Sequence, residues 1–282
     1  MTVVKIGLFG INTGACADPQ VALRVARAAE DAGFDSVWTA EHVVLPDPQA
    51  PPSPVPPETS LLDPAVALAY LAGGTERIQL GTGIIILPQR NPLVLAKELA
   101  TLDVVSNGRL IFGLGAGYLK AEFDALGMPF EDRGARTSEA IEVLRTLWTQ
   151  SKPHFEGRFW SFEGIQAHPL PLRSPHPPIF VGGHSPPAYR RAVAQGNGWY
   201  GFALDPEAAA GCIRGLAEAA ERVERPANLA PLELSLTPSV ALDRDTVRRY
   251  EDLGVSRLVA IGRGNDGDTL VKFVEQTAGT LL

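Results

Sequence analysis

Residues 77–117 read RIQLGTGIIILPQRNPLVLAKELATLDVVSNGRLIFGLGAG. The run begins with an apolar segment, 77–87, and ends with another, 109–117, and both have the length of a strand. Between them, residues 91–106 have helical spacing and open with an Asn-Pro pair, which is typical of an N-cap followed by a proline in the first turn. Strand, helix and strand in this order predict a βαβ unit whose two strands are parallel.

The same alternation continues in both directions along the chain. We expect strands over residues 3–10, 34–40, 77–87, 109–117, 177–183, 197–204, 232–241 and 255–262. We expect helices over residues 19–33, 62–74, 91–106, 133–150, 185–195, 206–224, 243–253 and 266–279. Near-continuous apolar strands favour a parallel sheet covered on both faces, and eight strand–helix pairs in 282 residues predict a (β/α)8 TIM barrel. An open, doubly wound sheet is the alternative.

Two stretches interrupt the alternation, and we interpret both as insertions in one domain that spans residues 1–282. The proline-rich residues 45–60 are predicted to form a long loop after the second strand, because the alternation continues on both sides of them. After the fourth strand, residues 118–132 are predicted to form a polar loop. Residues 152–166 alternate aromatic and polar side chains and predict a β-hairpin, so this insertion covers about 118–166.

Charge, hydropathy and cysteine content disfavour a nucleic-acid-binding protein and a membrane protein. The formal net charge is −7 and there is no basic run, which disfavours a nucleic-acid partner. No stretch approaches the roughly 18–20 apolar residues of a membrane span, and the N-terminus lacks signal-peptide architecture. Cys16 and Cys212 are far apart and lack the spacing of a metal or redox pair, so we expect idle thiols in a reducing compartment. These features predict a soluble, cytoplasmic protein with no membrane partner.

The ends of the predicted strands carry the candidate catalytic residues. In barrels of this kind the reactive groups lie at the C-terminal ends of the strands, and the second strand ends in Glu41 and His42. An isolated histidine is more often structural, but a histidine is also the usual general acid or base near neutral pH. Its position at a strand end favours a catalytic role for His42, with Glu41 orienting the ring or contacting a ligand.

Three further strand ends are rich in glycine, which lets the backbone approach a flat or phosphorylated ligand closely. The residues selected there as cofactor-binding are Thr82, Gly83, Ile84, Gly115, Ala116, Gly117, Gly182, Gly183, His184 and Ser185. Ser185 stands where the next helix is expected to begin, so backbone N–H groups and the helix dipole favour an anion at residues 182–185. A plain turn with a serine N-cap is the alternative at this position.

Other common motifs are absent. GLGAG (113–117) is not a dinucleotide fingerprint, because the position of the third glycine is Tyr118 and no helix is expected to follow directly. The GxSxG sequence of a nucleophile elbow is missing. HxxH, HExxH and paired-cysteine motifs are missing as well, so no catalytic metal is expected.

Several longer runs together resemble a known family. They are DAGFDSVWTAEH (31–42), the run 77–117 quoted above, EF (122–123), RGARTSEAIEVLRTLW (133–148), FEGRFWSF (155–162) and PPIFVGGHSPPAYRRAVAQGNGW (177–199). In this order they are similar to the luciferase-like monooxygenase family, which includes bacterial luciferase and the F420-dependent oxidoreductases. The resemblance covers most of residues 1–200, whereas the last 80 residues match only in their strand–helix alternation.

The resemblance implies a bacterial-luciferase-like barrel with a flavin or deazaflavin at its C-terminal mouth. It implies a non-prolyl cis peptide bond between Gly83 and Ile84, with Ile84 against the ring system. The family's acidic-His pair falls on Glu41 and His42, with the histidine near the ring to assist proton transfer. The GLGAG segment would line the ring and residues 182–185 would take the phosphate.

Among these enzymes, the F420-dependent subgroup is the most similar. The resemblance therefore implies coenzyme F420 and hydride transfer between the deazaflavin C5 and a small organic substrate, in a homodimer. Arg90, Lys120 and Arg133 are candidates to meet the acidic tail of F420. Some F420-dependent members have an acidic residue and an Asn where this chain has Tyr118 and Ala121, so their substrate chemistry does not transfer. An FMN-dependent monooxygenase is the first alternative, and a non-catalytic flavin-binding barrel is the second.

Overall fold

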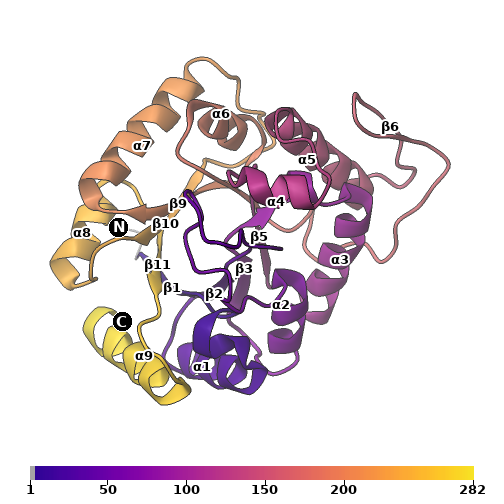
Figure 1. Cartoon of the computed structure of the whole chain (residues 1–282). Coiled ribbons are helices and arrows are strands. Elements are labelled where there is room, and N and C mark those ends of the chain that lie inside the picture. The colour runs from indigo at the N-terminus through magenta and orange to yellow at the C-terminus, as the bar shows by residue number, and fades with distance from the viewer. Residues whose placement is uncertain (1–3) are drawn as a thin grey trace.

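The computed structural model describes residues 4–282, and Val3, at the start of the first expected strand, lies outside the described residues. The barrel strands are β1 (Lys5–Phe9), β2 (Ser36–Thr39), β3 (Gln79–Thr82), β5 (Leu110–Gly115), β8 (Ile179–Gly182), β9 (Gly198–Leu204), β10 (Glu233–Pro238) and β11 (Arg257–Ile261). Neighbouring strands pair in parallel, and pairing of β3 with β5 closes the ring (Figure 1). The predicted (β/α)8 barrel is confirmed.

Helices surround the barrel (Figure 1). They are α1 (Pro19–Asp31), α2 (Pro64–Ala72), α3 (Pro92–Val105), α4 (Lys120–Ala125), α5 (Arg133–Thr149), α6 (Pro186–Gln195), α7 (Pro206–Ala220), α8 (Arg244–Asp252) and α9 (Gly267–Leu281). The predicted N-cap of α3 is confirmed, because the side chain of Asn91 accepts hydrogen bonds from first-turn backbone N–H groups. Asp63 caps α2 in the same way. In residues 4–282, no helix combines the length and the apolar character needed to cross a membrane.

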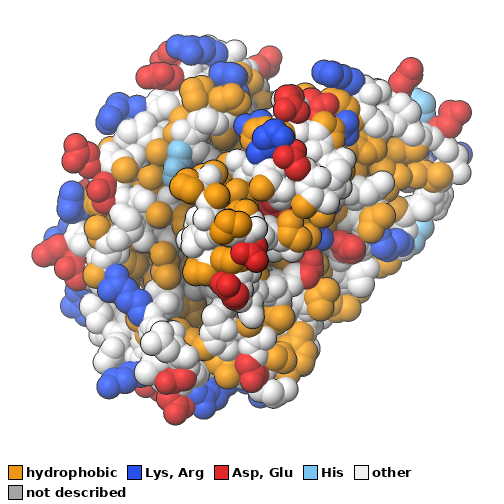
Figure 2. Space-filling view, viewed as in Figure 1, with side chains coloured by type: hydrophobic (Ala, Val, Ile, Leu, Met, Phe, Trp, Pro, Cys, Tyr) orange, Lys and Arg blue, Asp and Glu red, His pale blue; other side chains and the backbone are white. Residues whose placement is uncertain are grey.

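Both insertions are present, with one correction. The predicted loop 118–132 contains the helix α4, whose six residues are too few to show a helical hydrophobic period. The predicted hairpin is confirmed: β6 (Phe155–Glu156) pairs antiparallel with β7 (Ser161–Phe162). The segment between β2 and α2 crosses in front of the barrel mouth in Figure 1, and Figure 2 shows hydrophobic side chains over the centre of this face. This segment therefore covers part of the mouth.

Side chains fill the interior of the barrel. The buried residues there are Trp38, Ile111, Phe180, Tyr200 and Val259. The rings of Trp38 and Tyr200 stack with centroids 5.1 Å apart. A Cβ at Gly81 would lie 2.5 Å from the Trp38 ring, so the neighbouring strand needs a glycine at this position. Because the interior is packed, a large ligand has room only at the mouth.

A buried cation lies at the N-terminal end of the barrel. Arg257, with a side chain only 2% exposed, contacts Asp35 at 2.7 Å and Glu233 at 2.6 Å. It also donates to the Ser235 hydroxyl at 3.1 Å. These contacts join β11 and β10 to the start of β2 at the N-terminal end of the barrel. A ligand site is therefore expected at the C-terminal end.

We expect Arg257→Ala to lower the free energy of unfolding by about 3–5 kcal/mol, because it leaves two carboxylates near the barrel floor without their cation. The matched control is Arg24→Ala, which removes the ion pair between Arg24 and Asp268. The side chains of these two residues are 53% and 90% exposed, respectively. The control should change the free energy by no more than about 1 kcal/mol. Urea denaturation of both variants measures this, and equal losses would contradict the special role of Arg257.

Candidate active site

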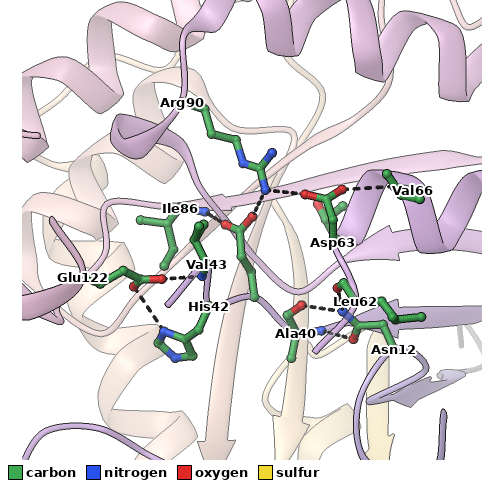
Figure 3. A network of polar contacts seen from close by, with 12 residues as sticks. Asn12, Ala40, His42, Val43, Leu62, Asp63, Val66, Ile86, Arg90 and Glu122 are labelled. Carbon is green, nitrogen blue, oxygen red and sulfur yellow. Dashed lines mark hydrogen bonds and ion pairs between the residues drawn. The ribbon is translucent and has the colours of Figure 1, made fainter. Parts of the chain in front are cut away.

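His42 lies just beyond the end of β2, with a side chain 10% exposed. Its Nδ1 atom is 3.2 Å from Oε2 of Glu122, which comes from α4 (Figure 3). The other carboxylate oxygen of Glu122 accepts the backbone N–H of Val43 at 2.5 Å and that of Val44 at 3.4 Å. One carboxylate therefore positions the imidazole and the backbone that follows it.

The protonation of this pair follows from its surroundings. Burial alone would raise the pKa of Glu122, but nearby donors on His42, Gln89 and the Val43 backbone hold the pKa below its ordinary value. An ionised carboxylate can only accept hydrogen bonds, so His42 Nδ1 carries the proton and donates. Nε2 is then the ring nitrogen available to a ligand. The edge of the half-exposed Tyr118 ring also contacts the imidazole, with centroids 6.1 Å apart.

Of the two roles predicted for Glu41, orienting the His42 ring does not agree with its contacts. Its side chain is 2% exposed and accepts hydrogen bonds from the Ile86 N–H and from Arg90 (Figure 3). Arg90 also contacts Asp63 at 2.8 Å. Consecutive side chains of an extended segment point in opposite directions, so Glu41 and His42 reach different neighbours. The acid beside His42 is Glu122, which is 80 residues further along the chain.

Asn12 is a site residue that the sequence did not single out. It is fully buried, and its amide oxygen accepts the Ala40 N–H at 2.8 Å. Its amide nitrogen donates to the carbonyl oxygens of Ala40 at 2.9 Å and Leu62 at 2.6 Å (Figure 3). Asn12 thereby joins the end of β2 to the far end of the long segment over the mouth.

The bond between Gly83 and Ile84 is cis, as the resemblance implies. The strand expected over residues 77–87 is interrupted at these two residues. Ile84 lies across the ends of two neighbouring strands: a Cβ at Gly115 would be 2.7 Å from its Cδ1 atom, and one at Gly182 would be 3.1 Å from its Cγ2 atom. The glycines thus make room for Ile84, and together the three residues form an apolar seat at the mouth. The Thr82 hydroxyl is used within the barrel, where it donates to the Gly113 carbonyl at 2.6 Å.

The loop after β5 begins with Ala116 and Gly117, which lead from this apolar seat toward α4. Gly117 has a positive φ of 75°, and a Cβ there would lie 2.7 Å from both Ile86 and Phe123. A left-handed backbone and this close packing both require glycine. The glycine at 117 is therefore explained by local packing, before any ligand is considered.

The loop after β8 has fewer hydrogen-bond donors for an anion than the sequence predicted. Ser185 is the N-cap of α6 and its side chain makes no capping hydrogen bond. The first two helical positions are Pro186 and Pro187, which have no N–H group. An anion would therefore depend on the Ser185 hydroxyl and on the backbone N–H groups of residues 183–185.

The ring of His184 in the same loop accepts a backbone hydrogen bond. Its Nε2 atom accepts the Phe202 N–H at 3.0 Å, so this nitrogen carries no proton. Burial lowers the pKa of His184, in agreement with that contact. Gly183, with φ 119°, provides the turn that places the ring there.

The predicted basic contacts to a cofactor tail are all engaged within the protein. Arg90 pairs with Glu41 and Asp63 as described. Lys120 contacts Asp124 at 2.6 Å. The Arg133 guanidinium lies 3.8 Å from the centre of the Phe130 ring. In residues 4–282 no group of three or more His, Cys, Asp or Glu side chains is arranged to hold a metal ion.

The Glu122 contact predicts which nitrogen of His42 carries the proton. In the neutral ring we expect the Nδ1–H form. In Glu122→Gln the amide oxygen would keep the Val43 N–H, which turns the amide NH2 toward His42 and moves the ring proton to Nε2. Imidazole ¹⁵N chemical shifts report the tautomer, and the exposed His154 in the same spectrum is the control. Persistence of the Nδ1–H form in Glu122→Gln would show that Glu122 does not set it.

Comparisons with known proteins identify the family of the chain. The sequence pattern of the luciferase-like monooxygenase family matches residues 5–268. The oxygenase component of a flavin-dependent trigonelline monooxygenase from Acinetobacter baylyi is 32% identical over 62% of this chain and 46% of its own length. The chain thus spans about half of that relative. The uncharacterized protein Rv0953c of Mycobacterium tuberculosis is 30% identical over 91% of this chain and 92% of its own.

Solved structures share the fold at low sequence identity. Monooxygenase RslO1 from Streptomyces bottropensis has a TM-score of 0.78 and 23% identity, covering 98% of both chains. An F420-dependent secondary alcohol dehydrogenase in complex with an F420-acetone adduct has a TM-score of 0.76 and 18% identity, covering 97% of this chain and 98% of its own. By its sequence pattern and its barrel, the chain belongs to the luciferase-like monooxygenase family and is an oxidoreductase.

Proposed function

We propose that the protein is an F420-dependent oxidoreductase that transfers a hydride between C5 of the deazaflavin and a small organic substrate. The observation that carries the proposal is the imidazole of His42, held at the barrel mouth by the buried, ionised Glu122. When an alcohol or amine is oxidised, its carbon loses a hydride and the hydroxyl or amino group on that carbon loses a proton. A histidine fixed by a carboxylate is suited to that proton transfer.

The residues at the mouth fit a planar ring system. Ile84 offers an apolar surface, and Gly115 and Gly182 leave no side chain beside it. Ala116 and Gly117 would extend this seat, and Ser185 with its preceding loop would bind the phosphate. When bound there, the deazaflavin would supply the hydride chemistry. Because Arg90, Lys120 and Arg133 have protein partners, the proposal depends on ring and phosphate contacts and not on a free basic rim.

The roles of the protein groups follow from the contacts. His42 Nε2 takes up the substrate proton in the oxidation direction and returns it in the reduction direction. Glu122 keeps the proton on Nδ1 and stabilises the charged ring while the proton is held. Glu41 is a positioning residue. Its ion pair with Arg90 holds the backbone next to His42 in place.

An FMN-dependent monooxygenase is the second candidate function. The specific observation in its favour is the 32% identity to a flavin-dependent monooxygenase component. A further solved structure with this fold, the oxygenating constituent of 3,6-diketocamphane monooxygenase in complex with FMN, has a TM-score of 0.75 and 16% identity. Both cofactors have flat ring systems, so the apolar seat at Ile84 suits either.

Binding of the two cofactors separates the candidates. We expect fluorescence titration to show tight binding of F420 and little affinity for reduced FMN. Tighter binding of reduced FMN, with oxygen-dependent turnover, would support the monooxygenase instead.

His42→Ala should retain F420 binding, because the ring seat lies on other strands. It should lose about 10²–10⁴-fold in turnover with any alcohol or amine that the wild type oxidises. His154→Ala, which removes an exposed histidine, is the control. Full turnover in His42→Ala would exclude the proton-transfer role.

We further propose that the protein is a homodimer through α2 and α3. These adjacent helices expose apolar side chains, with Val66 69%, Tyr70 41% and Val94 57% accessible. Contact between two copies of the chain at these helices would bury the three side chains.

Sedimentation analysis should therefore give the mass of two chains. The double variant Val66→Asp/Val94→Asp should sediment as one chain, because its charges would be buried in the interface. Leu282→Asp changes an equally exposed apolar residue at the C-terminus and should leave the mass unchanged. A single-chain mass for the wild type would contradict this proposal.

A further inference from the structure

Inward-facing side chains at the C-terminal ends of the strands form an apolar layer over the packed interior of the barrel. Phe9 on β1 and Ile84 after β3 pack directly on the buried interior cluster. Ile261 on β11 is the register neighbour of Phe9. Phe202 stands two residues after Tyr200 on β9, so it faces the interior as the Tyr200 ring does. This layer of Phe9, Ile84, Phe202 and Ile261 is the apolar floor of the mouth.

The apolar floor is continuous and partly exposed. The ring centroids of Phe9 and Phe202 are 5.0 Å apart and the ring planes meet at 56°, although two other strands separate β1 from β9. Phe9 also lies beside the backbone that leads to Ile84, because a Cβ at Gly83 would be 3.2 Å from its Cε2 atom. Phe202 and Ile261 are each 41% accessible. A ligand at the mouth would therefore contact these side chains.

A β-bulge directs Phe202 into the mouth. Between Gly201 and Leu204 the register of β9 with β10 shifts, so that three steps along β9 match two along β10. Within the bulge, Ala203 has a φ of 55°, a left-handed conformation that is uncommon for a residue with a Cβ. Bulges at the rims of barrels and next to active sites commonly redirect a side chain. The exposure of Phe202 is thus fixed by the backbone of β9.

His184 supports the bulge from the neighbouring strand end. Its Nε2 atom accepts the N–H of Phe202 at 3.0 Å. The last register pair of β8 and β9 is Gly182 with Tyr200, so this hydrogen bond continues the connection beyond the strands. His184 is therefore a positioning residue for the aromatic side chain at the mouth.

The apolar floor has two parts with different surroundings. Ile84 lies between Gly115 and Gly182, in the seat proposed for the cofactor ring. The other three residues lie on β1, β9 and β11, and β1 is the neighbour of β2, after which His42 stands. A molecule on this second part would lie on the same side of the mouth as the imidazole.

The side chains of Phe9, Phe202 and Ile261 carry no charge and no hydrogen-bonding group. A charged or strongly polar group placed on them would lose hydration without a replacement, which is unfavourable. A hydrocarbon ring would instead remove apolar surface from water on both sides of the contact. Such a ring can also pack on the tilted aromatic pair in a geometry that aromatic side chains favour. The surface therefore suits an uncharged, ring-shaped molecule.

We propose that Phe9, Phe202 and Ile261 bind the body of the substrate, and that the substrate is an uncharged alcohol with an alicyclic or aromatic ring. An amine would be charged at neutral pH, and these side chains offer no group to pair with that charge. In the oxidation direction the carbinol carbon loses a hydride to C5 of the oxidised deazaflavin, and the hydroxyl loses its proton to His42, which leaves a ketone or an aldehyde.

As a statement about the substrate, this inference rests on the proposed function. Binding of a ring to the apolar floor, however, needs no cofactor. The experiment therefore uses the cofactor-free protein, so that its failure and a failure of F420 binding are distinguishable.

The experiment compares three probes that share a six-carbon ring: cyclohexanol, cyclohexanecarboxylate and myo-inositol. NMR titration should show that cyclohexanol binds several-fold more tightly than the charged probe and the polyhydroxylated probe. Intermolecular NOEs should connect the cyclohexanol ring protons with the rings of Phe9 and Phe202 and with the methyl groups of Ile261. Equal binding of the three probes, or NOEs that spare these residues, would overturn the proposal.

Phe202→Ala tests the aromatic contact directly. It should weaken cyclohexanol binding about 2–10-fold, which is the contribution of one aromatic contact. Phe159→Ala is the control, because Phe159 belongs to the hairpin that projects from the outside of the barrel (Figure 1). Unchanged binding in Phe202→Ala would contradict the assignment of this surface.

His184→Ala removes the acceptor of the Phe202 N–H. It should weaken the NOEs between cyclohexanol and Phe202 and keep those to Phe9. His184→Gln, whose side-chain oxygen can accept the same N–H, should restore them. NOEs to Phe202 that stay unchanged in His184→Ala would show that His184 does not position this ring.

Discussion

The site depends on the buried carboxylate of Glu122. A charge with no solvent contact is strongly unfavourable unless hydrogen bonds satisfy it, and this carboxylate is satisfied by the His42 ring and by the backbone N–H groups of Val43 and Val44. All three donors follow β2, whereas the acceptor belongs to α4. The helix and the strand end therefore hold each other in place, and the imidazole cannot turn away without leaving the charge unpaired.

The backbone on which His42 stands is held residue by residue. Asn12 pairs with both backbone groups of Ala40, and Arg90 with the Ile86 N–H holds the Glu41 side chain. Glu122 then holds His42 itself. Each of these partners comes from a different part of the barrel rim. His42 is thus positioned rigidly although β2 has already ended at Thr39, which is what a proton-transferring group requires.

The two cofactor candidates share the same seat and differ elsewhere. Ile84 between Gly115 and Gly182 can support either ring system, because the contact is apolar and flat. The features that would distinguish them lie at the phosphate and tail. There the two prolines at the start of α6 remove N–H donors, and the nearby basic side chains are already paired. The other part of the mouth is more distinctive, since a bulge in β9 directs Phe202 toward Phe9.

The barrel itself was predictable from the sequence, because strand and helix periods and the N-cap Asn91 are local signals. The glycine-rich strand ends and the position of His42 at the mouth were predictable for the same reason, since a parallel barrel brings those ends together. The cis bond between Gly83 and Ile84 was predicted only through the resemblance to the family. The helix α4 was not predicted, because six residues are too few to show a helical period. Only the tertiary structure decided that Glu122 meets His42 and that Arg90 is taken by Glu41, because these contacts join residues 80 and 49 positions apart. Periodicity along a chain shows which face a residue occupies, but closure of the barrel determines which distant residue it faces.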